Sequence, residues 1–232
     1  MNTRSRPVAR SNHGQTIKSR VAIRRSAEAV RLDTLASLGP VPRLAIFASG
    51  SGTTAEAVMT ACLSGRVPAE VGVLVGNNSA AGVFAKAARA GIPARHLSGR
   101  THPEPDVLDA EILLTLNSAG TTHVVLAGYM KKIGPRTLEA FAGRIFNTHP
   151  ALLPAFGGQG MFGRHVHEAV LQSGVATTGA TVHLVDADYD TGKVVSQAEV
   201  PVMPGDTIDT LAERVQRAER ELLVQTLAAV FA

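Results

Sequence analysis

The chain has 232 residues, of which 45% are hydrophobic and 18% charged, a balance that is typical of a folded domain and excludes a disordered chain. No stretch approaches the roughly 20 consecutive apolar residues of a membrane span, and the single cysteine, Cys62, excludes an internal disulfide and a cysteine-rich zinc site. The net charge of +4 divides into +6 over residues 1–40 and −2 over the rest, so the body carries no electrostatic signature of nucleic-acid binding.

Residues 1–40 are rich in Arg and Ser and poor in acids. We expect a basic, disordered amino-terminal extension, or a start codon placed too early. An organellar transit peptide is the alternative, because such peptides have the same composition. The expected location is therefore cytoplasmic, with an organelle as the second choice. The stretch 39–42, Gly-Pro-Val-Pro, marks the start of one domain over residues 41–232.

From residue 43 onward, apolar runs alternate with helical patterns. Strands are predicted at 44–48, 71–75 and 124–127, and helices at 53–65, 80–90 and 107–116. Cys62 falls in the apolar pattern of the first helix, so we interpret it as a core residue. The alternation predicts an α/β fold with a doubly wound, mostly parallel sheet.

The carboxyl-terminal part has a different pattern. Residues 181–185 and 194–200 read as two strands joined by an acidic turn, which together form a β-hairpin. A long closing helix follows from about Thr207. Its expected inner face consists of Leu211, Val215, Leu222 and Leu223.

A glycine-rich loop, residues 49–54 (Ser-Gly-Ser-Gly-Thr-Thr), lies between the first predicted strand and helix. Glycines allow a ligand to approach the backbone, and the free N–H groups of a helix start favour an anion. The loop has neither the Lys of a nucleoside triphosphate loop nor the third glycine of a dinucleotide fingerprint. It therefore indicates a phosphate monoester site, with an ordinary strand–helix turn as the alternative.

Asn147 and His149 stand two apart near the end of an apolar strand that begins near Ile145. Alternate residues of a strand point to the same side, so both side chains project together where doubly wound sheets bind ligands. An amide can donate to an oxyanion and a histidine can exchange a proton, although a structural hydrogen-bonded pair is the simpler interpretation. One acid of the turn 186–190 is expected to orient His149, and the spacing leaves open which one.

These motifs resemble those of the phosphoribosylglycinamide (glycinamide ribonucleotide) formyltransferase family. The resemblance rests on residues 49–53, on 147–154 (Asn-Thr-His-Pro-Ala-Leu-Leu-Pro) and on 190–192, and it extends from about Arg43 to the carboxyl terminus. The stretch 156–163, followed by His167, is similar to a glycine-rich variant of the substrate loop of this family. The resemblance implies an enzyme that moves the formyl group of 10-formyltetrahydrofolate, its co-substrate, onto the amine of phosphoribosylglycinamide. It implies no metal.

The resemblance also implies residue roles. Asn147 would stabilise the oxyanion of a tetrahedral intermediate beside a protonated His149, and Asp190 would pair with His149 and assist proton transfer. His183 stands where the family has a further active-site histidine, with a supporting role in the strand as the alternative. The remaining implied contacts are Gly52, Thr53 and Thr54 to the substrate phosphate, Glu219 to the ribonucleotide, and Met130, Lys131, Lys132, Ile133 and Asn147 to the folate.

Two positions depart from the family pattern. Pro105 aligns with a folate-contacting Arg, for which Arg100 is the nearest substitute, and Lys131-Lys132 replaces a less basic pair in the folate-lining loop. The alternative functions are a 10-formyltetrahydrofolate hydrolase and a non-catalytic phosphosugar- or folate-binding module. The expected partners are small-molecule substrates, with no nucleic acid and no membrane, and the expected assembly is a monomer or a homodimer.

Overall fold

The computed structural model describes residues 23–24 and 41–232. The expectation of a disordered extension over residues 1–40 therefore lies outside the described residues, apart from the pair 23–24. In chain order the elements are β1 (Ile23–Arg24), β2 (Arg43–Ala48), α1 (Thr53–Leu63), β3 (Glu70–Gly76), α2 (Val83–Arg89), β4 (Ala94–His96), α3 (Pro105–Ser118), β5 (His123–Leu126), α4 (Pro135–Ala140), β6 (Ile145–His149), α5 (Arg164–Ser173), β7 (Thr177–Leu184), β8 (Val194–Pro201) and α6 (Ile208–Val230).

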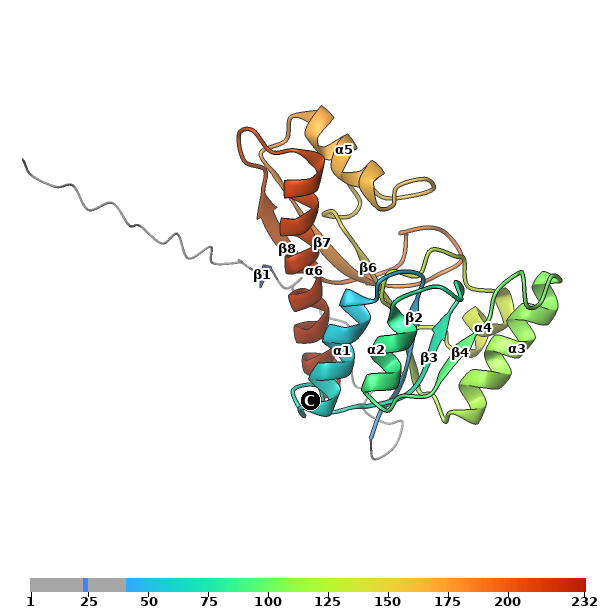
Figure 1. Cartoon of the computed structure of the whole chain (residues 1–232). Helices are drawn as coiled ribbons and strands as arrows, with labels where there is room; N and C mark the ends of the chain where they lie inside the picture. Colours follow the sequence, from blue (N-terminus) through green and yellow to red (C-terminus); the bar gives the residue numbers. More distant parts are fainter. Residues whose placement is uncertain (1–22, 25–40) are drawn as a thin grey trace, which may run out of the picture.

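Within these residues, the strands form one sheet in the order β1-β8-β7-β6-β5-β2-β3-β4. The strands from β6 to β4 run parallel to one another. Strand β7 lies antiparallel to β6, and β8 and β1 continue the antiparallel part. The predicted α/β fold, with its mostly parallel sheet and carboxyl-terminal hairpin, is confirmed (Figure 1).

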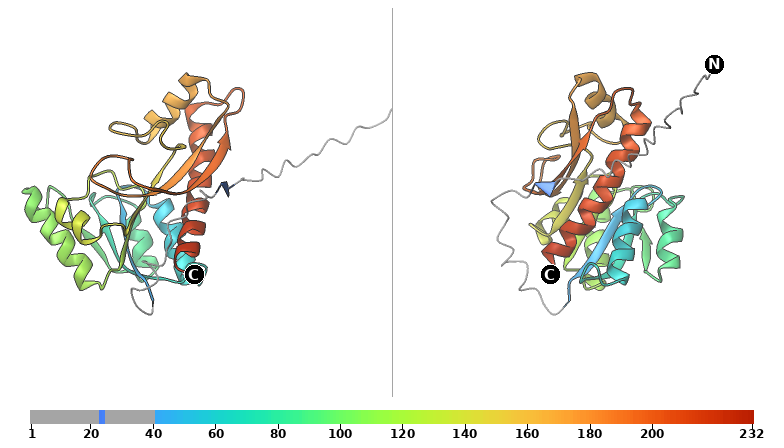
Figure 2. Two further views of the ribbon diagram at one scale, coloured as in Figure 1. Left: turned by 180° about the vertical axis from the view of Figure 1, so that it is seen from behind. Right: turned by 90° about the vertical axis from the view of Figure 1, so that its left-hand side faces the viewer.

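Helices cover both faces of the sheet because the central strands bury both of their sides. In β2, Leu44, Ile46 and Ala48 pack with α1, α2 and α6, whereas Ala45 and Phe47 pack on the opposite face with α3 and α4. This is the alternation of a strand with period two. Helix α6 runs beside α1 and across the hairpin (Figure 2). Its predicted inner residues, Leu211, Val215, Leu222 and Leu223, are all buried.

The predicted boundaries differ from the structure mainly at short elements. Strand β4 and helix α4 were not predicted, because three to six residues carry little hydrophobic periodicity. Helix α5 was not predicted either, although its buried residues Val166 and Val170 lie on one face. The predicted helix 80–90 begins only at Val83. Cys62 is half-buried against the core, and burial raises the pKa of its thiol to about 11, which agrees with its interpretation as a core residue.

The fold brings three strand ends together. Strands β2, β5 and β6 are neighbours in the parallel part of the sheet, so their carboxyl ends lie at the same edge. The loops that follow these strands meet there, which is the usual ligand position in doubly wound sheets.

Candidate active site

A cavity of about 670 Å³ opens at this edge. This volume lies within the range of small-molecule sites. Its walls come from the loop before α1, the loop after β5, the end of β6, the segment 158–163 and helix α6. The sequence-predicted residues that line it are Gly52, Thr53, Thr54, Met130, Lys131, Asn147, His149, Asp190 and Glu219.

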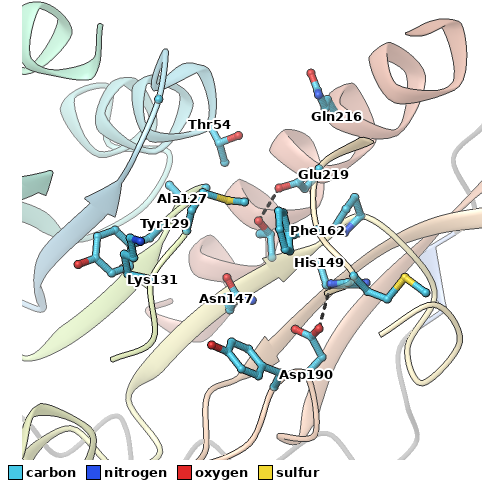
Figure 3. Close-up of a pocket in the computed structure, with 18 of the residues that line it drawn as sticks. Thr54, Ala127, Tyr129, Lys131, Asn147, His149, Phe162, Asp190, Gln216 and Glu219 are labelled. Carbon is cyan, nitrogen blue, oxygen red and sulfur yellow. Dashed lines mark hydrogen bonds and ion pairs between the residues drawn. The ribbon is translucent and has the colours of Figure 1, made fainter. Parts of the chain in front are cut away.

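The glycine loop supplies one end of the cavity (Figure 3). Gly52 is the amino-terminal cap of α1, and no side chain caps the helix. The amides of the first turn have no partner within the helix, so they and the Thr53 and Thr54 hydroxyls are available to an anion. The Ser49 hydroxyl accepts a hydrogen bond of 2.8 Å from the Met130 amide, which ties this loop to the loop after β5.

The end of β6 places Asn147 and His149 on the cavity wall, as their spacing predicted. His149 is 3% exposed, and its Nε2 donates to the Phe156 carbonyl across 2.8 Å. Asn147 Nδ2 lies 3.0 Å from Nε2 of His183, the residue opposite it on β7. The two side chains are therefore held by neighbours before any ligand enters.

Of the acids in the turn 186–190, it is Asp190 that faces the histidines. One carboxylate oxygen, Oδ2, lies 3.4 Å from His149 Nδ1 and accepts from the Gly158 amide at 3.0 Å. The other, Oδ1, lies 3.6 Å from His183 Nε2. Asp186 instead accepts hydrogen bonds from within its own turn. The tertiary structure thus settles the choice that the sequence spacing left open.

Opposing influences act on the charge of His149 in this cluster. Burial lowers the pKa of His149 below its ordinary value, even though Asp190 and the Phe156 carbonyl favour the charged ring, and nearby His183 adds to the lowering. Both ring nitrogens of His149 nevertheless face acceptors, the Phe156 carbonyl and the Asp190 carboxylate, an arrangement that suits the protonated ring implied by the sequence resemblance. Burial raises the pKa of Asp190, but contact with His183, the charge of His149 and the Gly158 amide outweigh it, so the carboxylate stays ionised.

Helix α6 contributes Glu219 and Gln216, one turn apart, to the same cavity (Figure 3). Glu219 accepts a hydrogen bond from the Thr148 hydroxyl. Burial raises the pKa of Glu219, against the opposing effects of Thr148 and Arg220. Gln216 was not predicted, since an exposed glutamine within an amphipathic helix carries no signal that distinguishes it from a solvent-facing residue.

The predicted folate loop divides between two cavities. Met130 and Lys131 line the large one, whereas Lys131, Lys132 and Ile133 line an adjoining cavity of about 90 Å³ that also reaches Asn147. Lys132 Nζ lies 5.6 Å from the centroid of the Tyr189 ring. Pro105, which aligns with the folate-contacting Arg of the family, lines neither cavity, and neither does Arg100, its nearest substitute.

Helix α5 brings in one further histidine. His167 lines the large cavity, is 2% exposed, and has a buried Nδ1 without a hydrogen-bond partner. Burial lowers its pKa, as do His149 and Arg164. The sequence placed His167 after the glycine-rich stretch without a role, because α5 itself was not predicted.

Two features are absent from residues 23–24 and 41–232, the part of the chain that the structure describes. No group of three or more His, Cys, Asp or Glu residues is placed to hold a metal ion. No helix there is long and apolar enough to cross a membrane.

Comparison with known proteins places these features in context. Residues 42–227 match the model of a family described as formyl transferase. The phosphoribosylglycinamide formyltransferase of Mycobacterium tuberculosis is 42% identical over 188 residues, which cover 81% of this chain and 84% of that protein. The chloroplastic phosphoribosylglycinamide formyltransferase of Arabidopsis thaliana is 39% identical over 189 residues, which cover 81% of this chain and 65% of that protein.

A solved structure agrees with the sequence matches. Glycinamide ribonucleotide transformylase 1 from Geobacillus kaustophilus superposes with a TM-score of 0.78 at 40% identity, covering 83% of this chain and all of that one. The chain spans about two thirds of the length of the Arabidopsis relative, at 65%, and 60% of a chloroplastic relative from Vigna unguiculata.

Proposed function

The chain belongs to the formyl transferase family, and from this premise we propose that it transfers the formyl group of 10-formyltetrahydrofolate to the amine of 5'-phosphoribosylglycinamide, a step of purine synthesis. The observation that carries the proposal is the cluster of Asn147, His149 and Asp190. It forms the wall of one cavity, between a helix start that suits a phosphate and the loop after β5.

The ribonucleotide would enter with its phosphate at the start of α1. Only one cationic side chain, that of Lys131, is among the described residues that line the cavity, so neutral donors must hold most of the phosphate charge. Gly52, Thr53 and Thr54 offer backbone amides and hydroxyls for this purpose, aided by the helix dipole. Glu219 would accept hydrogen bonds from the sugar or the glycinamide, which directs the substrate amine toward Asn147.

The folate would occupy the other side, where Met130 and Lys131 line the large cavity and Lys132 and Ile133 the small one. Its formyl carbon would then lie beside Asn147, which lines both cavities. The backbone of the loop would supply the hydrogen bonds, and the exposed side chains of Lys131 and Lys132 would contact the acidic tail of the folate. Binding of both substrates in one place removes much of the entropic cost of their encounter.

The reaction forms one bond and breaks one. The amine nitrogen attacks the formyl carbon, and the carbonyl electron pair moves onto oxygen. Asn147 donates to this oxyanion, a contribution of about 3–4 kcal/mol, and the imidazolium of His149 stabilises it by its charge. The amine proton passes by way of His149 and Asp190 to N10 of the folate, and the C–N10 bond breaks. Asp190, ionised beside the ring, stabilises the imidazolium that forms transiently.

The test is formyl transfer by the purified full chain with phosphoribosylglycinamide and 10-formyltetrahydrofolate, followed by the absorbance of the folate product. A reaction without the ribonucleotide runs beside it. Product that requires the ribonucleotide is the expected result. Equal product without it would mean a 10-formyltetrahydrofolate hydrolase, and ligand-induced stabilisation with no product would mean a binding module.

The location is a separate proposal. We favour the cytoplasm, although two plant relatives are named chloroplastic. A fluorescent protein fused to residues 1–40 tests this, since an even distribution in the host cell is expected and accumulation in an organelle would contradict it.

A further inference from the structure

Thr148 stands between Asn147 and His149 on β6 and takes no part in the proposed chemistry. The alternation of the strand turns its side chain to the opposite face of the sheet, which Phe146 shares with residues of α6. There its hydroxyl donates a hydrogen bond to Glu219 Oε1, drawn as the dashed line at Glu219 in Figure 3. We propose that Thr148 is a positioning residue, which orients the Glu219 carboxylate for the ribonucleotide and so sets the affinity for this substrate. The inference rests on the proposed function.

The Glu219 carboxylate reaches the cavity with few partners. Among the described residues, the Thr148 hydroxyl is its one hydrogen-bond donor, and no cation lies within ion-pair distance of it. Arg220, the next residue of the helix, acts on it only through its charge. A carboxylate that is held at one oxygen points in a fixed direction, and Oε2 is then left for a ligand. Without the hydroxyl, this flexible side chain would have no anchor at the cavity wall.

Thr148 is suited to this task because its own position is fixed. It is 9% exposed and β-branched, so few rotamers are open to its hydroxyl. Its strand also carries Asn147 and His149, so the same backbone sets the direction of Glu219 relative to the reacting groups. The hydroxyl favours the ionised carboxylate as well, since burial raises the pKa of Glu219 and the hydrogen bond from Thr148 opposes that rise.

The two substrates should depend on this contact unequally. The ribonucleotide presents hydroxyl and N–H donors, which an ionised carboxylate recognises because it can only accept hydrogen bonds. The small cavity on the folate side is lined by neither Thr148 nor Glu219. A misdirected Glu219 would therefore weaken the binding of the ribonucleotide and leave the binding of the folate unchanged.

The first experiment compares Thr148→Val with Thr148→Ser in the full chain. Valine has the shape of threonine without the hydroxyl. We expect it to raise KM for the ribonucleotide about 5- to 30-fold, part of the effect of a lost hydrogen bond to a charged group, with kcat and KM for the folate within about 3-fold. Thr148→Ser keeps a hydroxyl, so its KM for the ribonucleotide should stay within about 3-fold of the wild type.

The matched control is Thr178→Val. Thr178 is a buried threonine of β7 outside both cavities, and its hydroxyl has no hydrogen-bond partner among the described residues. The substitution makes the same change of side chain without removing a contact, so it should retain wild-type kinetics.

A double-mutant cycle separates positioning from direct contact with the substrate, since Thr148 itself lines the large cavity. If Thr148 acts through Glu219, Thr148→Val should raise KM less than about 2-fold in a Glu219→Ala background. An undiminished effect in that background, an unchanged KM in Thr148→Val, or a loss in Thr148→Ser as large as in Thr148→Val would overturn the inference, while wild-type turnover upholds the proposed function. An inactive wild-type chain would overturn both. Should Thr148→Val not fold, as judged by its melting temperature, Thr148→Ala takes its place in the cycle.

Discussion

Asp190 joins the loop between β7 and β8 to the two histidines of the site. Its backbone has a φ of 58°, a left-handed conformation that is uncommon outside glycine. Asp and Asn tolerate this conformation better than other residues. The loop therefore aims a carboxylate at His149 and His183 from a backbone that few other side chains would accept.

This conformation makes Asp190→Asn a clean test of charge. Asn adopts the same φ and keeps the size of the side chain, so we expect the free energy of unfolding to change by less than about 1 kcal/mol. Loss of the charge beside His149 should lower kcat by about 10²- to 10⁴-fold, the range of proton-transfer catalysis. Steady-state kinetics and urea unfolding measure the two quantities.

The matched control is Asp106→Asn, an exposed acid in the first turn of α3 that lines neither cavity. It should leave both turnover and stability near wild type. Near-normal turnover in Asp190→Asn would remove the carboxylate from the mechanism.

At the scale of elements, the start of α1 depends on a glycine for two reasons. Gly52 has a φ of 74°, and a Cβ at this position would lie 2.4 Å from Cγ2 of Val83 at the start of α2. The tight approach of the two helices therefore requires glycine where the phosphate is proposed to bind.

We expect Gly52→Ala to lower the free energy of unfolding by about 1–3 kcal/mol and to raise KM for the ribonucleotide more than KM for the folate. Adding Val83→Ala should recover only part of the stability, because the backbone conformation stays unfavourable. Gly50→Ala is the control for stability, since a Cβ there meets nothing within 4 Å. Equal stability of Gly52→Ala and Gly50→Ala in thermal unfolding would contradict this account.

Helices α3 and α4 are joined by a buried acid. Asp109, 3% exposed on α3, accepts hydrogen bonds from the Arg136 amide, the Thr137 amide and the Thr137 hydroxyl at the start of α4. It thus caps a six-residue helix that is too short to be stable alone.

For Asp109→Asn we expect a loss of about 1–3 kcal/mol in the free energy of unfolding. The NH₂ group of the asparagine would replace one of the two acceptor oxygens, so it would lie against an N–H or O–H donor of Arg136 or Thr137. Chemical denaturation measures the loss, and Asp106→Asn on the same helix serves again as the control. Indistinguishable midpoints for the two variants would show that α4 does not depend on this cap.

At the scale of the whole molecule, the carboxyl-terminal end of the chain packs against the edge of the sheet where the parallel strands begin. His123 is fully buried, and its ring lies 4.8 Å from that of Phe231, centroid to centroid. Its Nε2 has no hydrogen-bond partner among the described residues. Burial, with a smaller contribution from Arg144, lowers the pKa of His123 to about 4.

This shift predicts a pH-dependent stability. The unfolded chain binds a proton at His123 near pH 6.5, so between about pH 6.5 and pH 4 it binds more protons than the folded chain. The contribution of His123 to the free energy of unfolding is complete above pH 6.5. It is lost as the pH falls toward 4, and the total loss is roughly 3 kcal/mol. Urea unfolding across this range should show a shallower pH dependence for His123→Leu than for the wild type. The same slope for both proteins would exclude His123 as the cause.

Much of the fold was predictable because hydrophobic periodicity is a local property. The buried run of β2 and the inner face of α6, with Leu211 and Leu222, follow directly from their spacing. The position of Asn147 and His149 on the same side of β6 follows from the two-residue period of a strand. Helices α4 and α5 were not predicted. Helix α4 is stabilised by hydrogen bonds to Asp109 of α3, which is distant in the sequence, and α5 directly follows a glycine-rich stretch that is typical of a loop.

By itself, the sequence determined the fold class, the glycine loop and the motif residues, because each depends on residue types at short spacing. The spacing left open which acid meets His149, and the family resemblance implied Asp190, which the structure places beside the ring. Only the tertiary structure showed that His183 faces Asn147 and that Gln216 and His167 reach the cavity. Contacts between residues far apart in the chain, and the loss of water around them, arise only when the strands and helices pack.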